Sequence, residues 1–509
     1  MIKLTDYRGH IRNWEQLCEE LGVDKALAPK EREKAVITAG YEKWGNDIAD
    51  HLYGMFAFAI EDNGKIFAVR DHFGTKPFYY YVTAEGKLLY GTYIKDIING
   101  EGFIKELEPT ALQLYMTLTY VAGENTFFKG VKKLMPGHYL EFENGEVKLT
   151  RYFTPTFKPD ESKTLEEWAD EIHTTLQAIM PQVKLPEETA ESFLSGGVDS
   201  SYVLAMSDAK MSDSCGYDDE RFDESPLAKK TADLLGRENS RCLITPEMYF
   251  EAVPYVMKNM EQPLGDASAI VFAIACKETA KHTKLCYSGE GADEFFGGYN
   301  MYRNAERYGD NLKTFYVGNT NIMKEDEKKA LLKNYVEGVL PIDLVKHIYD
   351  ETEGLDPLTK MSDVDIQIWL EGDIYLNVDK MSEAAGLEIR MPLTDRRIFD
   401  IASRMPSRFK VNEEQNKVAF RTAAAKVLPE EIAFRKKLGF IVPIRIWMAD
   451  DNYNTSVREL LFSDTADKFF NKDEVRKIWD DYKGGNSDLW RKIWTIYTFL
   501  VWYREYFEK

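Results

Sequence analysis

The sequence is poor in the residues that build disulfides and dedicated metal sites. Its 509 residues include five cysteines, far apart and without CxxC spacing, and seven histidines without HxxxH or HExxH spacing. These patterns argue against a disulfide scaffold and against a dedicated metal site, and we expect a protein of the reducing cytoplasm. No apolar run approaches the roughly 20 residues that cross a bilayer, and the N-terminus has no signal-peptide pattern, so we expect no membrane partner.

Basic residues are outnumbered by acidic ones, 65 to 85. The formal net charge is -20, and a chain this acidic repels phosphate backbones, so we expect no nucleic-acid partner. A tRNA-modifying enzyme would also need a basic surface or an added RNA-binding module, and neither is visible. Hydrophobic residues make up 44% and aromatic residues 13%, which indicates a folded globular protein and not a disordered one.

Residues 1–155 have the pattern of an antiparallel domain. After helix-like stretches over 14–21 and 31–44, short aromatic-rich runs alternate with glycine turns. Asn63-Gly64 and Asn144-Gly145 each lie between two such runs, and Asn-Gly in this position predicts a type I′ hairpin, because both residues take positive φ. We predict an antiparallel β/α sandwich.

Residues 164–509 have a different pattern, after a linker over 154–163 that is rich in proline and charge. Strand-like Ser192–Leu194 and Lys284–Tyr287 each run into a glycine turn, and the first turn is followed by a helix predicted over 201–207. Repetition of strand, turn and helix predicts a parallel sheet covered by helices, here with mostly helical additions after residue 363. The fold class is therefore α/β, with two domains.

The strongest motif is Ser195-Gly196-Gly197-Val198-Asp199-Ser200. Its glycines let the backbone approach a phosphate chain, and the helix that follows aims its N-terminal amides at that anion. Asp199 is itself an anion, so it would hold a Mg²⁺ that contacts phosphate. No lysine follows, which excludes a Walker A loop.

Two signatures together resemble those of asparagine synthetases. SGGVDSS is similar to the pyrophosphate loop of ATP pyrophosphatases, which split ATP between its α and β phosphates. The run YSGEGADEFFGGY over 287–299 resembles the second asparagine synthetase signature. This resemblance covers almost the whole chain. It implies an AMP-forming amide-bond synthetase on an adenine-nucleotide alpha-hydrolase-like sheet, with ATP and Mg²⁺ as cofactors and a carboxylate and an amine as substrates.

The resemblance also assigns roles. Asp293 would be the second Mg²⁺ ligand opposite Asp199. Glu290 would be the base for the incoming amine. Lys437, in the loop RKKLGFIVP, would stabilise charge on the α-phosphate and the leaving pyrophosphate. The residues expected to contact the nucleotide are Leu194, Ser195, Gly196, Gly197, Asp199, Ser200, Cys215, Ser288 and Gly289.

The N-terminal domain departs from the family's glutaminase. The family's catalytic cysteine stands at the mature N-terminus, whereas this sequence begins Met1-Ile2 and its first cysteine, Cys18, lies in a predicted helix. Arg8 and His10 fall where the family has the asparagine and glutamate of a glutamine-binding stretch. We expect a truncated Ntn-hydrolase-like domain without glutaminase chemistry and with an exposed sheet edge.

Several alternatives follow for the amine. It could be free ammonia, another amine, or ammonia from a separate glutaminase subunit docked on the open edge. A ring-closing enzyme like beta-lactam or macrolactam synthetases is a further alternative, although beta-lactam synthetases carry tyrosine where this chain has Glu290. A non-catalytic regulator is disfavoured by the intact Asp199, Asp293 and Lys437. The resemblance makes aspartate or a related acid the expected acceptor, and a homo-oligomer remains open.

Overall fold

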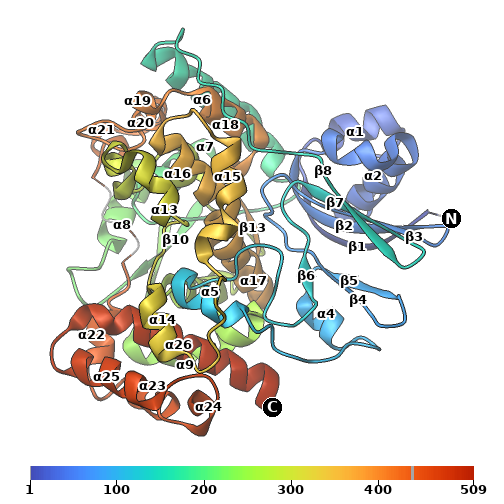
Figure 1. Ribbon diagram of the computed structural model, residues 1–509. Helices are drawn as coiled ribbons and strands as arrows, with labels where there is room; N and C mark the ends of the chain where they lie inside the picture. The colour runs from blue at the N-terminus through green and yellow to red at the C-terminus, as the bar shows by residue number, and fades with distance from the viewer. Residues whose placement is uncertain (1, 437–438, 440) are drawn as a thin grey trace.

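The computed structural model describes residues 2–436, 439 and 441–509, and its N-terminal part is an antiparallel sandwich flanked by helices (Figure 1). One sheet has the order β1-β2-β3-β7-β8 and a smaller sheet the order β5-β4-β6. The strands of the larger sheet are β1 (Ile2–Ile11), β2 (Gly54–Asp62), β3 (Lys65–Arg70), β7 (His138–Glu143) and β8 (Glu146–Arg151). The smaller sheet consists of β4 (Tyr79–Val82), β5 (Leu88–Gly91) and β6 (Lys132–Lys133).

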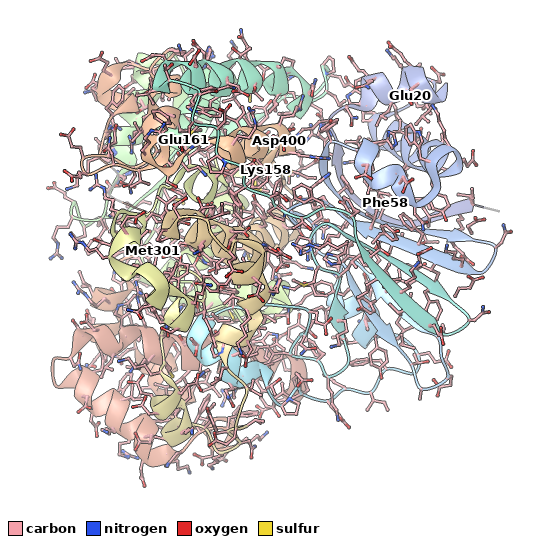
Figure 2. All side chains as sticks on the ribbon, turned by 45° about the horizontal axis from the view of Figure 1, so that its top comes forward. Glu20, Phe58, Lys158, Glu161, Met301 and Asp400 are labelled. Carbon is pink, nitrogen blue, oxygen red and sulfur yellow. The ribbon has the colours of Figure 1, made fainter. Side chains whose placement is uncertain are left out.

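Alternation along β2 explains why the larger sheet is covered on both faces. Phe56, Phe58 and Ile60 pack in one buried cluster with residues of α1 (Trp14–Leu21) and α2 (Pro29–Trp44). Ala57 and Ala59 point to the opposite face, where a second cluster lies against the smaller sheet. Successive strand residues face opposite sides, so one run of apolar residues fills two layers. Figure 2 labels the fully buried Phe58.

The two predicted hairpins are confirmed. Asn63 and Gly64 have φ of 51° and 87°, and Asn144 and Gly145 have φ of 53° and 85°. They join β2 to β3 and β7 to β8, both antiparallel. β1 lies at the edge of its sheet.

The C-terminal part is built on a five-stranded sheet in which every pairing is parallel. Its order is β11-β10-β9-β12-β13, so the chain starts in the middle and moves outward in both directions. The strands are β9 (Glu191–Phe193), β10 (Met211–Gly216), β11 (Glu238–Leu243), β12 (Leu285–Tyr287) and β13 (Glu388–Arg390). In such open sheets, ligands bind beyond the carboxyl ends of the strands, where the order reverses. Here that position lies between β9 and β12.

Helices pack around this sheet and extend beyond it (Figure 1). Those that position the site are α7 (Val198–Met206), α8 (Ser225–Leu234), α10 (Ser268–Thr279), a π-helical segment η5 (Asp365–Tyr375), α17 (Leu376–Ala385) and α20 (Val418–Ala424). The C-terminal helices end in α26 (Trp490–Tyr503). No described helix is both long and apolar enough to cross a membrane.

One boundary differs from the sequence-based expectation. α7 begins at Val198 and not at Ser201, because the glycine turn ends at Gly197 and the helix starts at once. α6 (Leu165–Val183) is capped by Thr164, which forms a capping box with Glu167. The linker contacts the C-terminal part, since Lys158 N donates to Ser403 O at 3.0 Å. The domain limits 1–155 and 164–509 stay a prediction.

Candidate active site

The two signature turns meet at the carboxyl ends of neighbouring strands. β9 and β12 pair in parallel, so the turns after them emerge at the same edge of the sheet. A Cβ atom on Gly289 would lie 2.9 Å from both the Asp199 carbonyl carbon and the Ser200 nitrogen. Real Cβ atoms do not approach backbone this closely, so the two turns pack backbone against backbone and glycine is required at this contact.

The first turn folds over the start of α7. Gly196 has a φ of 81°, and a Cβ there would lie 3.1 Å from the Ala228 nitrogen on α8. Ser195 N donates to Ser200 Oγ at 3.1 Å. These contacts hold the turn at the N-terminal end of a nine-residue helix, where backbone amides and the helix dipole favour an anion.

Lys417 links the two predicted metal ligands. Its Nζ lies 2.6 Å from Asp199 Oδ2 and 2.7 Å from Asp293 Oδ1, and its side chain is 1% exposed. Asp199 Oδ1 is buried and accepts no hydrogen bond within the described part of the chain. The two carboxylates are partly buried, with side chains 19% and 17% exposed, and the buried ammonium group supplies the positive charge that offsets them.

A cavity of about 840 Å³ lies over these turns. The predicted site residues that line it are Leu194, Ser195, Gly196, Gly197, Asp199, Ser200, Cys215, Ser288, Gly289, Glu290 and Asp293. The structure therefore brings together predicted residues from three separate stretches of the chain. Lys437 lies outside the described residues, although its neighbours Lys436 and Gly439 line the cavity.

Two glutamates of the second turn differ in their surroundings. Ser288 Oγ donates to Glu290 Oε1 at 3.4 Å, and Glu290 faces the cavity. Glu294 is buried, and desolvation together with the Asp293 charge raises its pKa to about 8. It accepts a hydrogen bond from Tyr299 Oη at 2.6 Å. Glu294 thus keeps its proton at neutral pH and supports the turn, while Glu290 borders the space where reactants would lie.

Sequence reasoning missed Lys417, although a signal for it exists. Lys417 precedes the apolar run of α20 and has a φ of 58°, which is unusual for any residue other than glycine. Helix N-termini favour acidic or neutral caps, so a buried lysine here opposes the helix dipole. An unfavourable charge at a helix start is the pattern that could have indicated a site residue.

Arg421 holds this lysine's segment in place. Its guanidinium donates to Asn416 O at 2.9 Å, to Ala433 O at 2.7 Å and to Arg435 O at 2.9 Å. Arg435 in turn donates to Gly196 O at 2.9 Å. These hydrogen bonds therefore connect the first turn, α20 and the segment around Arg435.

Part of the cavity lining is acidic. Asp266 and Asp373 both line the cavity, and burial together with the Asp266 charge raises the pKa of Asp373 well above its ordinary value. Trp369 Nε1 donates to Asp373 Oδ2 at 2.9 Å, while Asp373 Oδ1 is buried without a hydrogen-bond partner in the described part of the chain. Arg491 also lines the cavity, and its charge acts to lower the pKa of Asp266, which burial raises.

The N-terminal residues expected at a former glutamine site have other partners. Arg8 Nη2 donates to Asp379 Oδ1 on α17 at 3.0 Å. His10 lies between Glu33 Oε1 at 2.8 Å and Gln182 O at 3.0 Å. Cys18 is 1% exposed, and burial raises the pKa of its thiol. The thiol is neither accessible nor activated.

A five-stranded parallel sheet with a glycine-rich phosphate turn, joined to an antiparallel sandwich, defines a nucleotide-using synthetase with an amidotransferase-like domain. Residues 187–504 match the family model described as asparagine synthase, and residues 3–153 match that described as glutamine amidotransferase domain. The chain belongs to the asparagine synthetase family. It is a carbon–nitrogen ligase that converts ATP to AMP and diphosphate.

Similar proteins carry both parts. The chain is 33% identical to asparagine synthetase (glutamine-hydrolyzing) 1 of Bacillus subtilis (strain 168), over 99% of this chain and 85% of that protein. It is 28% identical to a putative asparagine synthetase (glutamine-hydrolyzing) of Mycobacterium bovis, over 99% of this chain and 84% of that protein. A third, asparagine synthetase (glutamine-hydrolyzing) 3 of Bacillus subtilis (strain 168), is 26% identical over 85% of this chain and 74% of that protein.

Proposed function

We propose that this chain adenylates the carboxylate of aspartate or a related amino acid and transfers the acyl group to ammonia without hydrolysing glutamine itself. One observation carries the proposal: the two signature turns and the Asp199–Lys417–Asp293 bridge line a single cavity. A nucleotide, an acid and an amine can react in one enclosed space only if their binding groups converge in this way.

The nucleotide half of the cavity suits Mg-ATP. The turn of residues 195–197 and the start of α7 would hold the β and γ phosphates. Cys215, at the end of β10, would lie beside the adenine. Asp199 and Asp293 fit Mg²⁺, because the cation prefers carboxylate oxygens and Asp199 Oδ1 is buried without a partner among the described residues.

Lys417 would have one role before the nucleotide binds and another role afterwards. Before binding, its ammonium group neutralises the two carboxylates. With a Mg²⁺ held by the two carboxylates, the ammonium group of Lys417 would be available to stabilise negative charge on the leaving pyrophosphate. Lys437 is proposed to act on the same charge, and its neighbours Lys436 and Gly439 line the cavity.

The reaction follows from these positions. The acceptor carboxylate attacks the α-phosphorus, pyrophosphate leaves, and an acyl-adenylate forms. Ammonia then attacks the acyl carbon, and AMP leaves. Glu290 borders the cavity and would take the proton that the attacking nitrogen loses.

The acidic part of the cavity supports an acceptor that carries an ammonium group. Asp373 is buried and Asp266 is partly buried, and desolvation raises the pKa of each carboxyl group. A substrate α-ammonium placed between them would offset their negative charge, and Arg491 could receive an α-carboxylate. This combination favours an α-amino acid such as aspartate over a simple dicarboxylic acid.

The nitrogen source is proposed to be ammonia from solution or from a separate glutaminase subunit. A glutaminase of this class needs an accessible nucleophilic thiol, and Cys18, the single cysteine before residue 215, is buried. Purified chain is expected to release no glutamate from glutamine, with or without ATP and acceptor. Steady release by the chain alone would refute this part, and release only with an added subunit would support the split enzyme.

A ring-closing synthetase is the second candidate. The cavity could hold one substrate bearing both amine and carboxylate, but Glu290 as proton acceptor favours two separate reactants.

We propose that the reaction takes place in the cytoplasm, because the cysteines are few and scattered. Gel filtration with light scattering would decide whether the chain forms a homo-oligomer.

Isotope exchange between pyrophosphate and ATP tests the first half-reaction, because exchange needs an acid but no amine. Aspartate is expected to support exchange, and succinate, which lacks the ammonium group, is expected to fail. Asp199→Asn and Asp293→Asn should each abolish exchange while the circular dichroism spectrum stays unchanged. ADP as the nucleotide product would contradict the proposal.

A further inference from the structure

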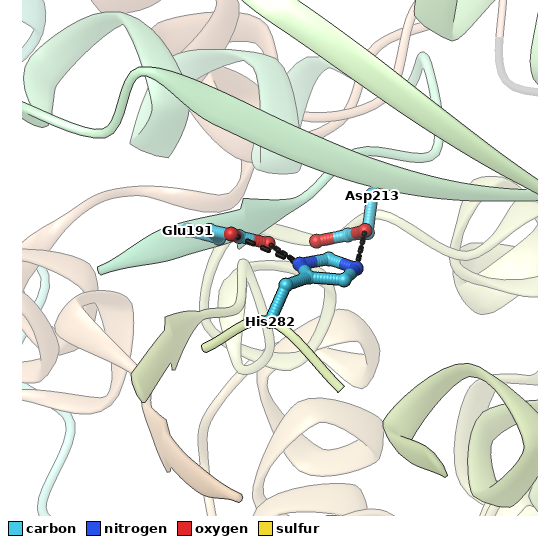
Figure 3. A group of neighbouring side chains, drawn as sticks. All are labelled: Glu191, Asp213 and His282. Atoms are coloured by element: carbon cyan, nitrogen blue, oxygen red, sulfur yellow. Dashed lines mark hydrogen bonds and ion pairs between the residues drawn. The ribbon is translucent and has the colours of Figure 1, made fainter. Parts of the chain in front are cut away.

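Three side chains that could bind a metal ion meet beneath the nucleotide turns. Glu191 begins β9, Asp213 lies within β10, and His282 lies in the turn between α10 and β12. Each offers one ligand atom, and these atoms all lie within 4.8 Å of one another. Figure 3 shows both carboxylates pointing toward the imidazole ring.

Strand register brings the two carboxylates together. Asp213 pairs with Phe193 in parallel β10 and β9. Glu191 precedes Phe193 by two residues, and residues two apart point to the same face of a sheet. Both carboxylates therefore project from one face, although 22 positions separate them in the chain.

The cluster combines two carboxylates with one imidazole, which carries positive charge only when it is protonated. His282 Nδ1 lies 2.9 Å from Glu191 Oε2, and His282 Nε2 lies 3.8 Å from Asp213 Oδ1. Asp213 is 8% exposed, and its Oδ2 atom is buried with no hydrogen-bond partner in the described chain. Burial and the nearby Glu191 charge raise the pKa of Asp213 to about 8. A cation would satisfy both the charge and the unpaired oxygen.

We propose that Glu191, Asp213 and His282 bind a divalent transition-metal ion of the Zn²⁺ or Mn²⁺ type. Two carboxylates with one imidazole suit these ions, which accept both oxygen and nitrogen ligands at about 2.0–2.2 Å. The imidazole disfavours Mg²⁺, which prefers oxygen ligands alone. The ring of His282 is 40% exposed, so an ion can enter from solvent.

The site would be structural and separate from the proposed Mg²⁺ site. Glu191 stands four residues before Ser195, and Asp213 stands two before Cys215. His282 stands six before Ser288. A metal ion bound by all three side chains would link β9, β10 and the turn before β12. The proposed nucleotide-binding residues follow these strands.

The test is a calorimetric titration of chelator-treated, nucleotide-free protein with Zn²⁺ and, in a separate experiment, with Mn²⁺. Without nucleotide, Lys417 lies between Asp199 and Asp293 and disfavours a cation there. We expect one ion per chain, and an affinity that falls more than about tenfold in His282→Gln and in Glu191→Gln. Asp199→Asn should bind the ion as the natural protein does.

Glu278→Gln is the matched control for Glu191→Gln, since Glu278 lies nearby but pairs with Lys281. Co²⁺ gives an independent readout: its visible absorption should change on binding to the natural protein and to Glu278→Gln, and not to His282→Gln. The proposal is overturned if the natural protein binds no ion at millimolar metal. It is also overturned if His282→Gln binds the metal ion as tightly as Glu278→Gln does. The two carboxylates would then share a proton and not a metal ion.

Discussion

At the scale of single residues, the centre of the site is a charge balance held by one lysine. The buried ammonium group of Lys417 offsets two partly buried carboxylates that would otherwise repel each other. Removing it leaves their charge uncompensated, which destabilises the folded protein. This charge balance can be measured, because a metal cation can replace the ammonium group of the lysine.

Lys417→Met should lower the thermal midpoint of the nucleotide-free protein and abolish pyrophosphate exchange. Added Mg²⁺ should raise the midpoint of the variant more than that of the natural protein, since the ion can occupy the position of the lost ammonium. Differential scanning fluorimetry across a Mg²⁺ series measures this. An equal response of both proteins would mean that Lys417 does not occupy the cation position.

Glu290→Gln should separate the two half-reactions. The amide cannot accept a proton from the attacking nitrogen, while the phosphate-binding groups stay in place. Pyrophosphate exchange is expected to persist, and amide formation is expected to fall by about 10²–10⁴-fold. Loss of exchange together with amide formation would assign Glu290 to the adenylation step.

At the scale of elements, buried ion pairs join the two parts of the molecule. Glu371 on η5 contacts Arg70 of β3 at 2.9 Å and Lys133 of β6 at 2.7 Å. Although burial opposes its charge, these cations hold the pKa of Glu371 below its ordinary value. Asp379 on α17 contacts Arg8 and Lys76 in the same way. Both η5 and α17 also line the cavity, so the sandwich positions elements of the active site.

Glu371→Gln is expected to destabilise the protein by about 3–5 kcal/mol, because two buried cations lose their partner. Glu383→Gln is the matched control. Its side chain is 52% exposed and pairs with Arg8, so its effect should stay within about 1 kcal/mol. Urea unfolding gives both values. Similar losses in the two variants would show that burial does not determine the contribution of these pairs.

The elements also show what local sequence can and cannot predict. Asn63-Gly64 specifies a hairpin because its backbone preference is local, and SGGVDSS specifies a phosphate turn for the same reason. Lys417 was missed because its partners lie 218 and 124 positions earlier in the chain. The Glu191–Asp213–His282 cluster depends on strand register, which no spacing reveals.

At the scale of the whole molecule, stability depends on pH through buried carboxyl groups. Asp365 is buried, and desolvation raises its pKa to about 7 from 3.8. It accepts hydrogen bonds from Tyr302 and Tyr316 at 2.5 and 2.6 Å. The folded protein holds this proton above pH 4 while the unfolded chain releases it. The contribution to stability is therefore present at low pH and is lost as pH rises from about 4 through 7.

Asp365→Asn should remove this dependence, because an amide does not ionise and its oxygen can still accept from the two tyrosines. Relative to the natural protein, the variant is expected to gain up to about 4 kcal/mol between pH 4 and pH 8. Urea unfolding at pH 5, 6, 7 and 8 measures the difference between the two. A difference that does not change with pH would contradict the raised pKa.

The ion pairs between the two parts also constrain how this protein can evolve. Acids such as Glu371 and Asp379 sit in the synthetase half, and the cations that neutralise them come from the sandwich half. Deleting the sandwich would leave several buried negative charges without their partners. If the chain does not hydrolyse glutamine, as proposed, selection would still retain the sandwich for the positive charges that it supplies to the synthetase half.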